Sequence, residues 1–160
     1  MLSSVISPEL KTADKNSLYP EIHQALRAVL TGETDLIANL ANIAAALKEQ
    51  FQWLWVGFYL VKENELVVGP FQGPPACTRI SKGRGVCGAC WTQNKTISVP
   101  DVEKFPGHIA CSSLSRSEIV IPINLRNEFV GLLDVDSEAL SAFDSTDQRY
   151  LEQIVSFIKF

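Results

Sequence analysis

The sequence predicts an α+β fold in which helices near both ends of the chain flank a central antiparallel sheet. Two patterns carry this prediction: apolar residues recur at helical spacing near each end, and the middle alternates between β-branched or aromatic runs and short turns. The chain has 160 residues, of which 46% are hydrophobic and 20% charged, as in ordinary globular domains. We therefore expect a single layered domain over residues 1–160.

Two amphipathic helices are predicted within residues 18–52, after an N-terminal extension of residues 1–17. The apolar positions of the first helix are Ile22, Leu26, Val29 and Leu30. Thr34 is the expected N-cap of the second helix. The apolar stripe of that helix is Leu36, Leu40, Ile43 and Leu47. Each helix thus has one face to bury.

The remaining residues, 53–160, are expected to hold the sheet and a last helix. The predicted strands are 53–61, 66–71, 77–80, 96–99, 118–125 and 129–136. The first two and the last two of these should form hairpins. Pro122 implies that its strand lies at an edge or contains a bulge there.

A glycine-rich segment precedes a short helix predicted at residues 86–93. Gly83, Gly85 and Gly88 match G-x-G-x-x-G. A dinucleotide site needs these glycines inside a parallel βαβ unit, whereas the neighbouring segments predict hairpins. We interpret them as a tight turn that leads into the helix.

The chain closes with a helix. Asp144 is its expected N-cap, and Asp147 favours the positive end of the helix dipole from the first turn. The residues expected to face inward are Leu151, Ile154, Val155 and Ile158.

The net charge of the chain indicates which classes of binding partner it can have. A formal net charge of -4 and an isoelectric point near 5.2 lack the basic excess that neutralises phosphates. We therefore expect neither nucleic acid nor a membrane surface as a partner, and favour a small molecule. The first residues lack the basic and apolar regions of a signal peptide, and no stretch approaches the roughly 20 apolar residues that span a bilayer. We expect a cytoplasmic protein.

All four cysteines lie within residues 77–111. Cytoplasmic thiols are kept reduced, so such a cluster is more often catalytic, redox-active or metal-binding than a permanent staple. A plausible zinc set has the pattern C-x2-C followed by H-x2-C and consists of Cys87, Cys90, His108 and Cys111. Cys87 and Cys90 also suit a buried core.

In the redox interpretation, Cys111 lies in the polar segment GHIACSS, where a protonated His108 would help stabilise its thiolate. An isolated histidine more commonly completes a loop hydrogen bond.

Three carboxylates, Glu118, Asp134 and Asp136, interrupt otherwise apolar strands. Asp134 and Asp136 are two residues apart, so they share one face of their strand. Adjacent carboxylates repel, which raises their pKa values unless a cation or hydrogen-bond donors lie between them. The group suits an ammonium pocket or a proton donor. A simpler alternative for Asp136 is that it ends the strand together with Ser137.

Aromatic residues alternate along the first strand. Trp53, Trp55 and Tyr59 are expected on one face, with a bend at Gly57. Most aromatic residues in such a strand fill a core, but those that line a cleft would hold a small apolar group.

With these residues in place, the sequence resembles the free methionine-(R)-sulfoxide reductases, a family of single GAF domains. The resemblance runs from about Trp55 through the last helix and includes the spacing of Cys77, Cys87 and Cys111. It is carried by WVGFYL, GPFQG, VPDVEKFPGHIACSSLSRSEIVIPI, and GLLDVDS followed by FDSTD. The resemblance implies an antiparallel sheet of about six strands with the N- and C-terminal helices packed on one face. Cys90 matches no position that we recognise in this family.

The resemblance also implies reduction of free L-methionine-(R)-sulfoxide, with no cofactor and no metal. Cys111 would be the nucleophile and would form a sulfenic acid, which Cys77 or Cys87 resolves as a disulfide. We favour Cys77 because Pro74 and Pro75 place it in a loop. Thioredoxin would reduce the disulfide. The residues implied in substrate binding are the carboxylates Glu118, Asp134 and Asp136 and the aromatic wall Trp55 and Tyr59.

Two alternatives involve no catalysis: a GAF sensor that binds a small ligand, and a binding domain stabilised by zinc. A homodimer is compatible with the sequence, which does not fix the oligomeric state.

Overall fold

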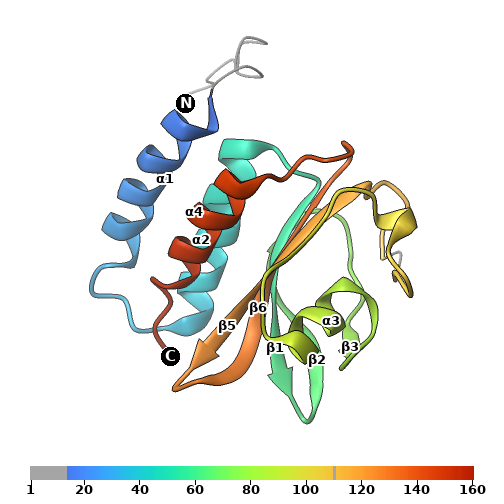
Figure 1. The fold of residues 1–160 in the computed structure, drawn as a ribbon. Coiled ribbons are helices and arrows are strands. Elements are labelled where there is room, and N and C mark those ends of the chain that lie inside the picture. The colour runs from blue at the N-terminus through green and yellow to red at the C-terminus, as the bar shows by residue number, and fades with distance from the viewer. Residues whose placement is uncertain (1–13, 110) are drawn as a thin grey trace.

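The computed structural model describes residues 14–109 and 111–160, which form the predicted α+β fold (Figure 1). The α-helices of these residues are α1 (Lys15–Leu30), α2 (Leu36–Phe51), α3 (Gly85–Gln93) and α4 (Ser145–Val155). The strands are β1 (Trp55–Lys62), β2 (Glu65–Gln72), β3 (Arg79–Ser81), β4 (Ile97–Val99), β5 (Ser117–Leu125) and β6 (Glu128–Ser137). They form a six-stranded antiparallel sheet in the order β3-β2-β1-β6-β5-β4. Helices α1, α2 and α4 lie on one side of this sheet and α3 on the other.

The first two helices begin at different residues from those predicted. The Asp14 side chain accepts a hydrogen bond from the Asn16 backbone N–H and caps α1, so the helix begins at Lys15 rather than at residue 18. The remainder of the predicted extension, residues 1–13, lies outside the described residues. Asp35, not Thr34, caps α2, because Asp35 Oδ1 accepts from Ala38 N at 2.8 Å. Aspartate is the stronger cap, and the sequence places it one residue later than we predicted.

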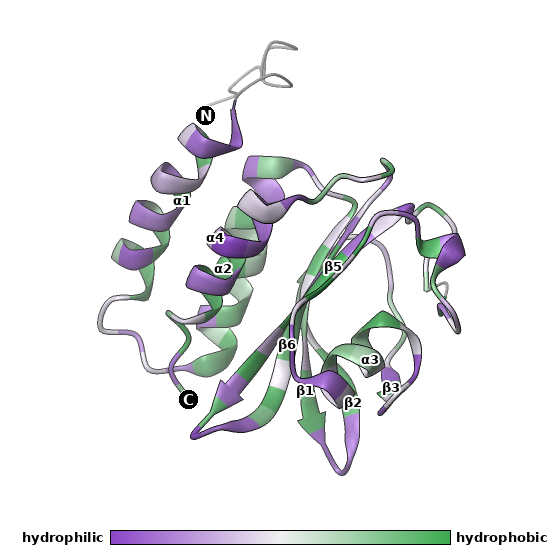
Figure 2. Cartoon of the chain, in the orientation of Figure 1, coloured by the Kyte–Doolittle hydropathy of each residue, from purple (hydrophilic) through white to green (hydrophobic). Residues whose placement is uncertain are grey.

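The sheet has two faces that pack against different partners. Along β1, Val56 and Phe58 face the helix-side core with α1, α2 and α4, whereas Trp55 and Tyr59 belong to a second cluster with α3. Figure 2 shows the apolar faces of α1, α2 and α4 turned toward the sheet. The expectation that Trp53 shares the face of Trp55 is wrong. Trp53 precedes β1, so strand alternation does not govern it, and its ring stacks on Phe51 at 4.3 Å.

Pro122 lies where the prediction requires. Strand β4 pairs with β5 only through Glu118, Ile119 and Val120, so at Pro122 the strand has β6 as its paired neighbour and no β4 residue opposite. A proline that lacks an N–H therefore costs no hydrogen bond to β4. A register shift follows between Ile123 and Asn124.

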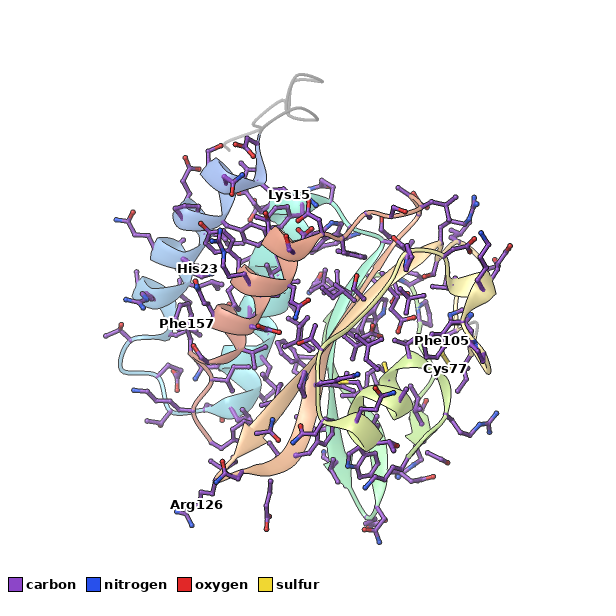
Figure 3. All side chains as sticks on the ribbon, in the orientation of Figure 1. Lys15, His23, Cys77, Phe105, Arg126 and Phe157 are labelled. Carbon is purple, nitrogen blue, oxygen red and sulfur yellow. A yellow bond between two sulfur atoms is a disulfide. The ribbon has the colours of Figure 1, made fainter. Side chains whose placement is uncertain are left out.

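A buried polar cluster fastens α1 to α4. Asp144 and Asp147 form the capping box of α4, as the sequence predicts for the cap. Asp147 is fully buried and accepts hydrogen bonds from the Tyr19 hydroxyl at 2.7 Å and from the Lys15 ammonium. Figure 3 shows Lys15 at the end of this helical layer, with Cys77 and Phe105 on the opposite side of the sheet. Ile158 follows the end of α4 and still packs against the helix-side core.

Within the described residues, none of the helices has both the length and the apolar character needed to cross a bilayer.

Candidate active site

The strand register brings the three predicted carboxylates together. In the β5–β6 pair, Glu118 lies opposite Asp136 and Val120 lies opposite Asp134. Strand β1 then places Trp55 opposite Asp136 on the other side of β6. Residues paired directly across strands point to the same face of a sheet, so these side chains lie on the α3 face.

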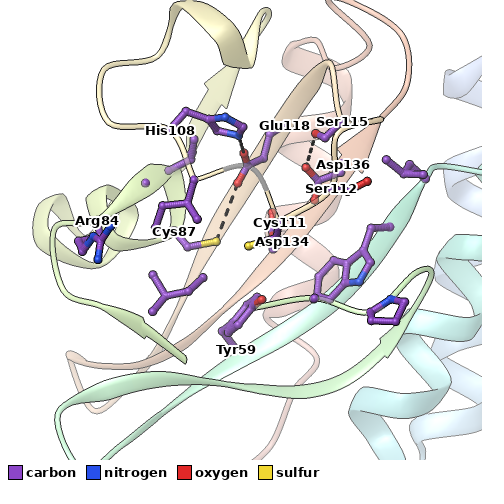
Figure 4. A pocket seen from close by; sticks show the side chains of 18 residues that line it. Tyr59, Arg84, Cys87, His108, Cys111, Ser112, Ser115, Glu118, Asp134 and Asp136 are labelled. Atoms are coloured by element: carbon purple, nitrogen blue, oxygen red, sulfur yellow. Dashed lines mark hydrogen bonds and ion pairs between the residues drawn. The ribbon is translucent and has the colours of Figure 1, made fainter. Parts of the chain in front are cut away.

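These side chains line a pocket between the sheet, α3 and the loop that carries Cys111 (Figure 4). Its empty space is about 570 Å³, including the open mouth. Of the predicted site residues, Cys77 alone is not in the lining. The others line it: Trp55, Tyr59, Cys87, Cys111, Glu118, Asp134 and Asp136. The expectation that Trp55 and Tyr59 form an aromatic wall beside the acids agrees with this geometry, and their rings stack with centroids 5.9 Å apart.

Burial makes the carboxyl groups weak acids. Burial, with repulsion from Asp134 and Asp136, raises the pKa of Glu118 well above its usual value. Burial and the neighbouring Asp136 raise the pKa of Asp134 in the same way. Burial raises the pKa of Asp136 to about 6, although the Ser115 hydroxyl, which donates to Asp136, opposes the rise. At neutral pH the group therefore retains protons that it can donate.

Two of the cysteines are buried thiols on α3. Cys87 lies 3.9 Å from Glu118 Oε1, and burial together with the charges of Asp134 and Glu118 raises the pKa of its thiol well above the usual value. Cys90 lies 4.0 Å from the Val120 carbonyl oxygen, and burial raises its pKa to about 12. Neither is favoured as a thiolate in this state.

The other two cysteines form a disulfide. Cys77 and Cys111 are joined across 34 residues, with their Cα atoms 5.5 Å apart. The structure therefore does not assemble the zinc set of Cys87, Cys90, His108 and Cys111, because the Cys111 sulfur is bonded to Cys77. The aromatic wall supports the Cys77 segment: the Tyr59 hydroxyl donates to the Cys77 carbonyl at 2.8 Å.

His108 has a different partner from the one predicted. Its Nε2 lies 3.7 Å from Glu118 Oε2, and burial lowers its pKa. A lowered pKa disfavours the imidazolium that the redox interpretation requires beside a Cys111 thiolate. Figure 4 shows the imidazole turned toward Glu118.

Sequence reasoning missed two polar contacts of the pocket, His108 with Glu118 and Ser115 with Asp136. Both join a loop residue to a strand residue, and no local pattern encodes such a pair. The hairpin register does not predict them either, because it sets Ser117 opposite Ser137 and leaves the path of the preceding loop open.

The glycine-rich segment is the predicted tight turn. Gly83 and Gly85 have φ values of +82° and +62° between β3 and α3. A Cβ on Gly88 would lie 2.8 Å from the Ser81 carbonyl oxygen. The glycines thus let α3 approach the end of β3, which brings Cys87 into the pocket.

Known proteins share this architecture over most of the chain. The GAF domain family model matches residues 35–159. GAF domain-containing protein A of Dictyostelium discoideum is 59% identical over 151 residues, which are 94% of this chain and 96% of that protein. Free methionine-R-sulfoxide reductase of Escherichia coli is 42% identical over 144 residues, covering 89% of this chain and 87% of that protein. The X-ray structure of free methionine-R-sulfoxide reductase from Neisseria meningitidis in complex with its substrate superposes with a TM-score of 0.90 at 54% identity, covering 91% of this chain and 89% of that chain.

Proposed function

We propose that this chain, which belongs to the GAF domain family and within it to the free methionine-R-sulfoxide reductases, reduces free L-methionine-(R)-sulfoxide to methionine. The observation that carries the proposal is the Cys77–Cys111 disulfide beside a pocket that holds three carboxyl groups. A dithiol that can close to a disulfide supplies the two electrons of the reduction. Weakly acidic carboxyl groups supply the protons.

Cys111 acts as the nucleophile. Its sulfur attacks the sulfoxide sulfur while a protonated pocket carboxyl, Glu118 or Asp134, gives a proton to the sulfoxide oxygen. The hydroxyl of this adduct then passes to the Cys111 sulfur: an S–O bond to Cys111 forms while the S–O bond to the substrate sulfur and the bond between the two sulfurs break. Methionine leaves, and Cys111 is left as a sulfenic acid. The Cys77 thiol attacks this sulfenic acid, water leaves and the disulfide forms. An external dithiol, thioredoxin, reduces the disulfide by exchange.

The environments of the thiols support this order of roles. Cys111 is half-buried and lines the pocket, and its bond to Cys77 needs no rearrangement of α3. Cys87 lies against Glu118 with a strongly raised pKa, which makes it a poor attacking group. Cys87 is the alternate resolving thiol in this scheme.

The pocket selects the free amino acid through its charge. One of the three carboxyl groups, Glu118 or Asp134, gives the proton, and the remaining carboxylates of the group take the substrate ammonium. Trp55 with Tyr59 packs against the apolar end of the side chain. A methionine sulfoxide inside a peptide has no ammonium there, so its binding leaves the buried carboxyl groups unpaired. We assign the enzyme to the cytoplasm, where thioredoxin keeps it reduced, and a homodimer is compatible with this scheme.

The test is an NADPH-coupled thioredoxin assay on three substrates: the free R sulfoxide, the free S sulfoxide and a peptide sulfoxide. We expect turnover of the free R form alone. Cys111→Ser should lower turnover by about 10³-fold or more, because the nucleophile is lost. Cys90→Ser is the matched control, since Cys90 lies outside the pocket lining, and it should retain turnover.

Undiminished turnover in Cys111→Ser would overturn the assignment of the nucleophile. Binding of the sulfoxide without turnover by the parent protein would instead support a non-catalytic sensor.

A further inference from the structure

Three groups with metal-binding chemistry meet in the pocket from three different elements. They are the thiol of Cys87 on α3, a carboxyl oxygen of Glu118 on β5 and a carboxyl oxygen of Asp134 on β6, and the three atoms lie within 4.8 Å of one another. Cys87 Sγ lies 3.9 Å from Glu118 Oε1 (Figure 4). All three residues line the pocket, so a small ion can reach them through its mouth.

One carboxyl oxygen of the group has no hydrogen-bond partner among the described residues. It is the buried Oδ1 of Asp134, a residue that is 7% exposed. Burying such an acceptor unpaired is costly, so the site favours a donor or a cation that would satisfy it. No lysine or arginine in residues 14–109 and 111–160 forms an ion pair with Glu118, Asp134 or Asp136. The imidazole of His108 lies 3.7 Å from Glu118, but burial lowers its pKa and so disfavours its charged form.

We propose that Cys87, Glu118 and Asp134 form a binding site for a borderline-soft divalent cation of the Zn²⁺ class, and that the bound ion blocks the pocket. Zinc takes thiolate sulfur at about 2.3 Å and carboxylate oxygen at about 2.0–2.2 Å, so ligand atoms around it lie roughly 3.5 Å apart. The observed spacing requires a contraction of about 1 Å. One thiolate with two carboxylates favours zinc over calcium or magnesium, which prefer all-oxygen ligands.

This site uses one cysteine of the zinc set predicted from the sequence and replaces the others. Cys111 is bonded to Cys77, and Cys90 points to the Val120 carbonyl oxygen. The strand register supplies Glu118 and Asp134 in their place. The metal site does not depend on the proposed reaction. Its inhibitory role does, because the ion and the substrate ammonium would share at least one of Glu118 and Asp134.

The test uses the full chain in its oxidised form, with ZnCl₂ as the probe. With Cys77 and Cys111 locked as a disulfide, Cys87 and Cys90 are the free thiols, so the redox pair cannot bind the ion. Competition against a chromophoric zinc indicator should give about one equivalent of bound Zn²⁺ per chain. Cys87→Ser and Asp134→Asn should each weaken binding by about tenfold or more, because each removes a ligand. Cys90→Ser is the matched control and should bind as the parent does.

The absorption spectrum of bound Co²⁺ reports directly whether a thiolate binds the metal, and an unfolded variant would not show that signal. Co²⁺ substituted for Zn²⁺ should show thiolate-to-metal charge-transfer absorption in the parent and in Cys90→Ser, and none in Cys87→Ser. Equal zinc affinity of the parent and Cys87→Ser, or loss of binding in Cys90→Ser alone, would overturn the site.

Zinc binding measured with and without free methionine distinguishes the proposed metal site from the proposed binding of the substrate ammonium. If the ion and the ammonium share the carboxylates, methionine should raise the apparent Kd of Zn²⁺ in the oxidised parent. Zinc binding that methionine leaves unchanged would keep the metal site and overturn its inhibitory role, together with the assignment of Glu118 or Asp134 to the ammonium.

Discussion

The two faces of the sheet bury different kinds of side chain: the helix-side face buries apolar residues, and the pocket-side face buries carboxyl groups beside apolar ones. Along β6, Leu133 and Val135 pack into the helix-side core, while Asp134 between them enters the pocket and is 7% exposed. The same strand therefore contributes to the stability of one layer and to the chemistry of the other. Strand alternation assigns each residue to its layer.

A buried carboxyl on each side makes the difference plain. Asp147, on the helix side, is fully buried and satisfied by the Tyr19 hydroxyl, the Lys15 ammonium and the Asp144 backbone N–H. Asp134, on the pocket side, leaves Oδ1 without a partner among the described residues. A satisfied buried acid fastens helices together, whereas an unsatisfied one keeps a capacity to bind a cation or to hold a proton.

The largest effect should come from breaking the helix side. Phe58 is fully buried against α1, α2 and α4, so Phe58→Ala should lower the free energy of unfolding by about 3–5 kcal/mol, through lost burial and the cavity that remains. Urea denaturation measures this. Phe71→Ala is the control on the pocket side: Phe71 is half-buried and stacks on Trp55, and its loss should cost clearly less. Equal losses would contradict the division between the two faces.

The next effect is a pH dependence that differs in sign between the faces. Burial raises the pKa of Asp136 to about 6 in the folded protein, against about 4 in the unfolded chain. The folded state therefore binds the proton more tightly, and the stability from this group is complete below pH ~4 and lost as the pH rises to about 6. Asp136→Asn should remove that fall and raise the free energy of unfolding at pH 7 by about 2 kcal/mol, measured by urea denaturation between pH 3 and 7.

Asp144 on the helix side is the matched control. Its slight burial would raise the pKa, but hydrogen bonds from the backbone of Asp147 and Thr146 and the charge of Lys15 lower it instead. Its contribution is thus present above its unfolded pKa and lost as the pH falls through the folded value. Asp144→Asn should destabilise the protein at pH 7 and have little effect at pH 3. The same pH response in both variants would refute the contrast.

Much of the fold followed from periodicity and spacing, whereas most of the candidate site residues were named through the family resemblance. The alternation of LLDVDS put Asp134 and Asp136 on one face, and the structure adds the register that sets Glu118 opposite Asp136. The errors lie at the boundaries of helices and strands. Asp35 rather than Thr34 caps α2, and Trp53 belongs to the helix-side core because the strand begins after it.

The contacts of loop residues were beyond the sequence. The redox interpretation set His108 beside Cys111, three residues away, and the alternative gave it a hydrogen bond within its loop; its side chain lies beside Glu118 in β5. Ser115 donates to Asp136, which is 21 residues away. Such pairs depend on how the loop before β5 folds over the sheet, and no periodicity describes that path.

The smallest effect should come from a tyrosine hydroxyl on the pocket face, for which a tyrosine on the helix face is the comparison. On the pocket side, the Tyr59 hydroxyl donates to the Cys77 carbonyl at 2.8 Å, so it holds the segment that carries one cysteine of the disulfide. Tyr59→Phe keeps the ring and should lower the free energy of unfolding by about 0.5–1.5 kcal/mol. It should also shift the Cys77–Cys111 equilibrium in glutathione buffers toward the dithiol, by at most about tenfold.

On the helix side, Tyr19→Phe loses a hydrogen bond to the carboxyl of Asp147 and should lower the free energy of unfolding by about 1.5–3 kcal/mol. Because Tyr19 touches neither cysteine segment, its disulfide equilibrium should match that of the parent. A shift in the Tyr19→Phe equilibrium as large as that of Tyr59→Phe would mean that the disulfide responds to global stability rather than to the pocket wall.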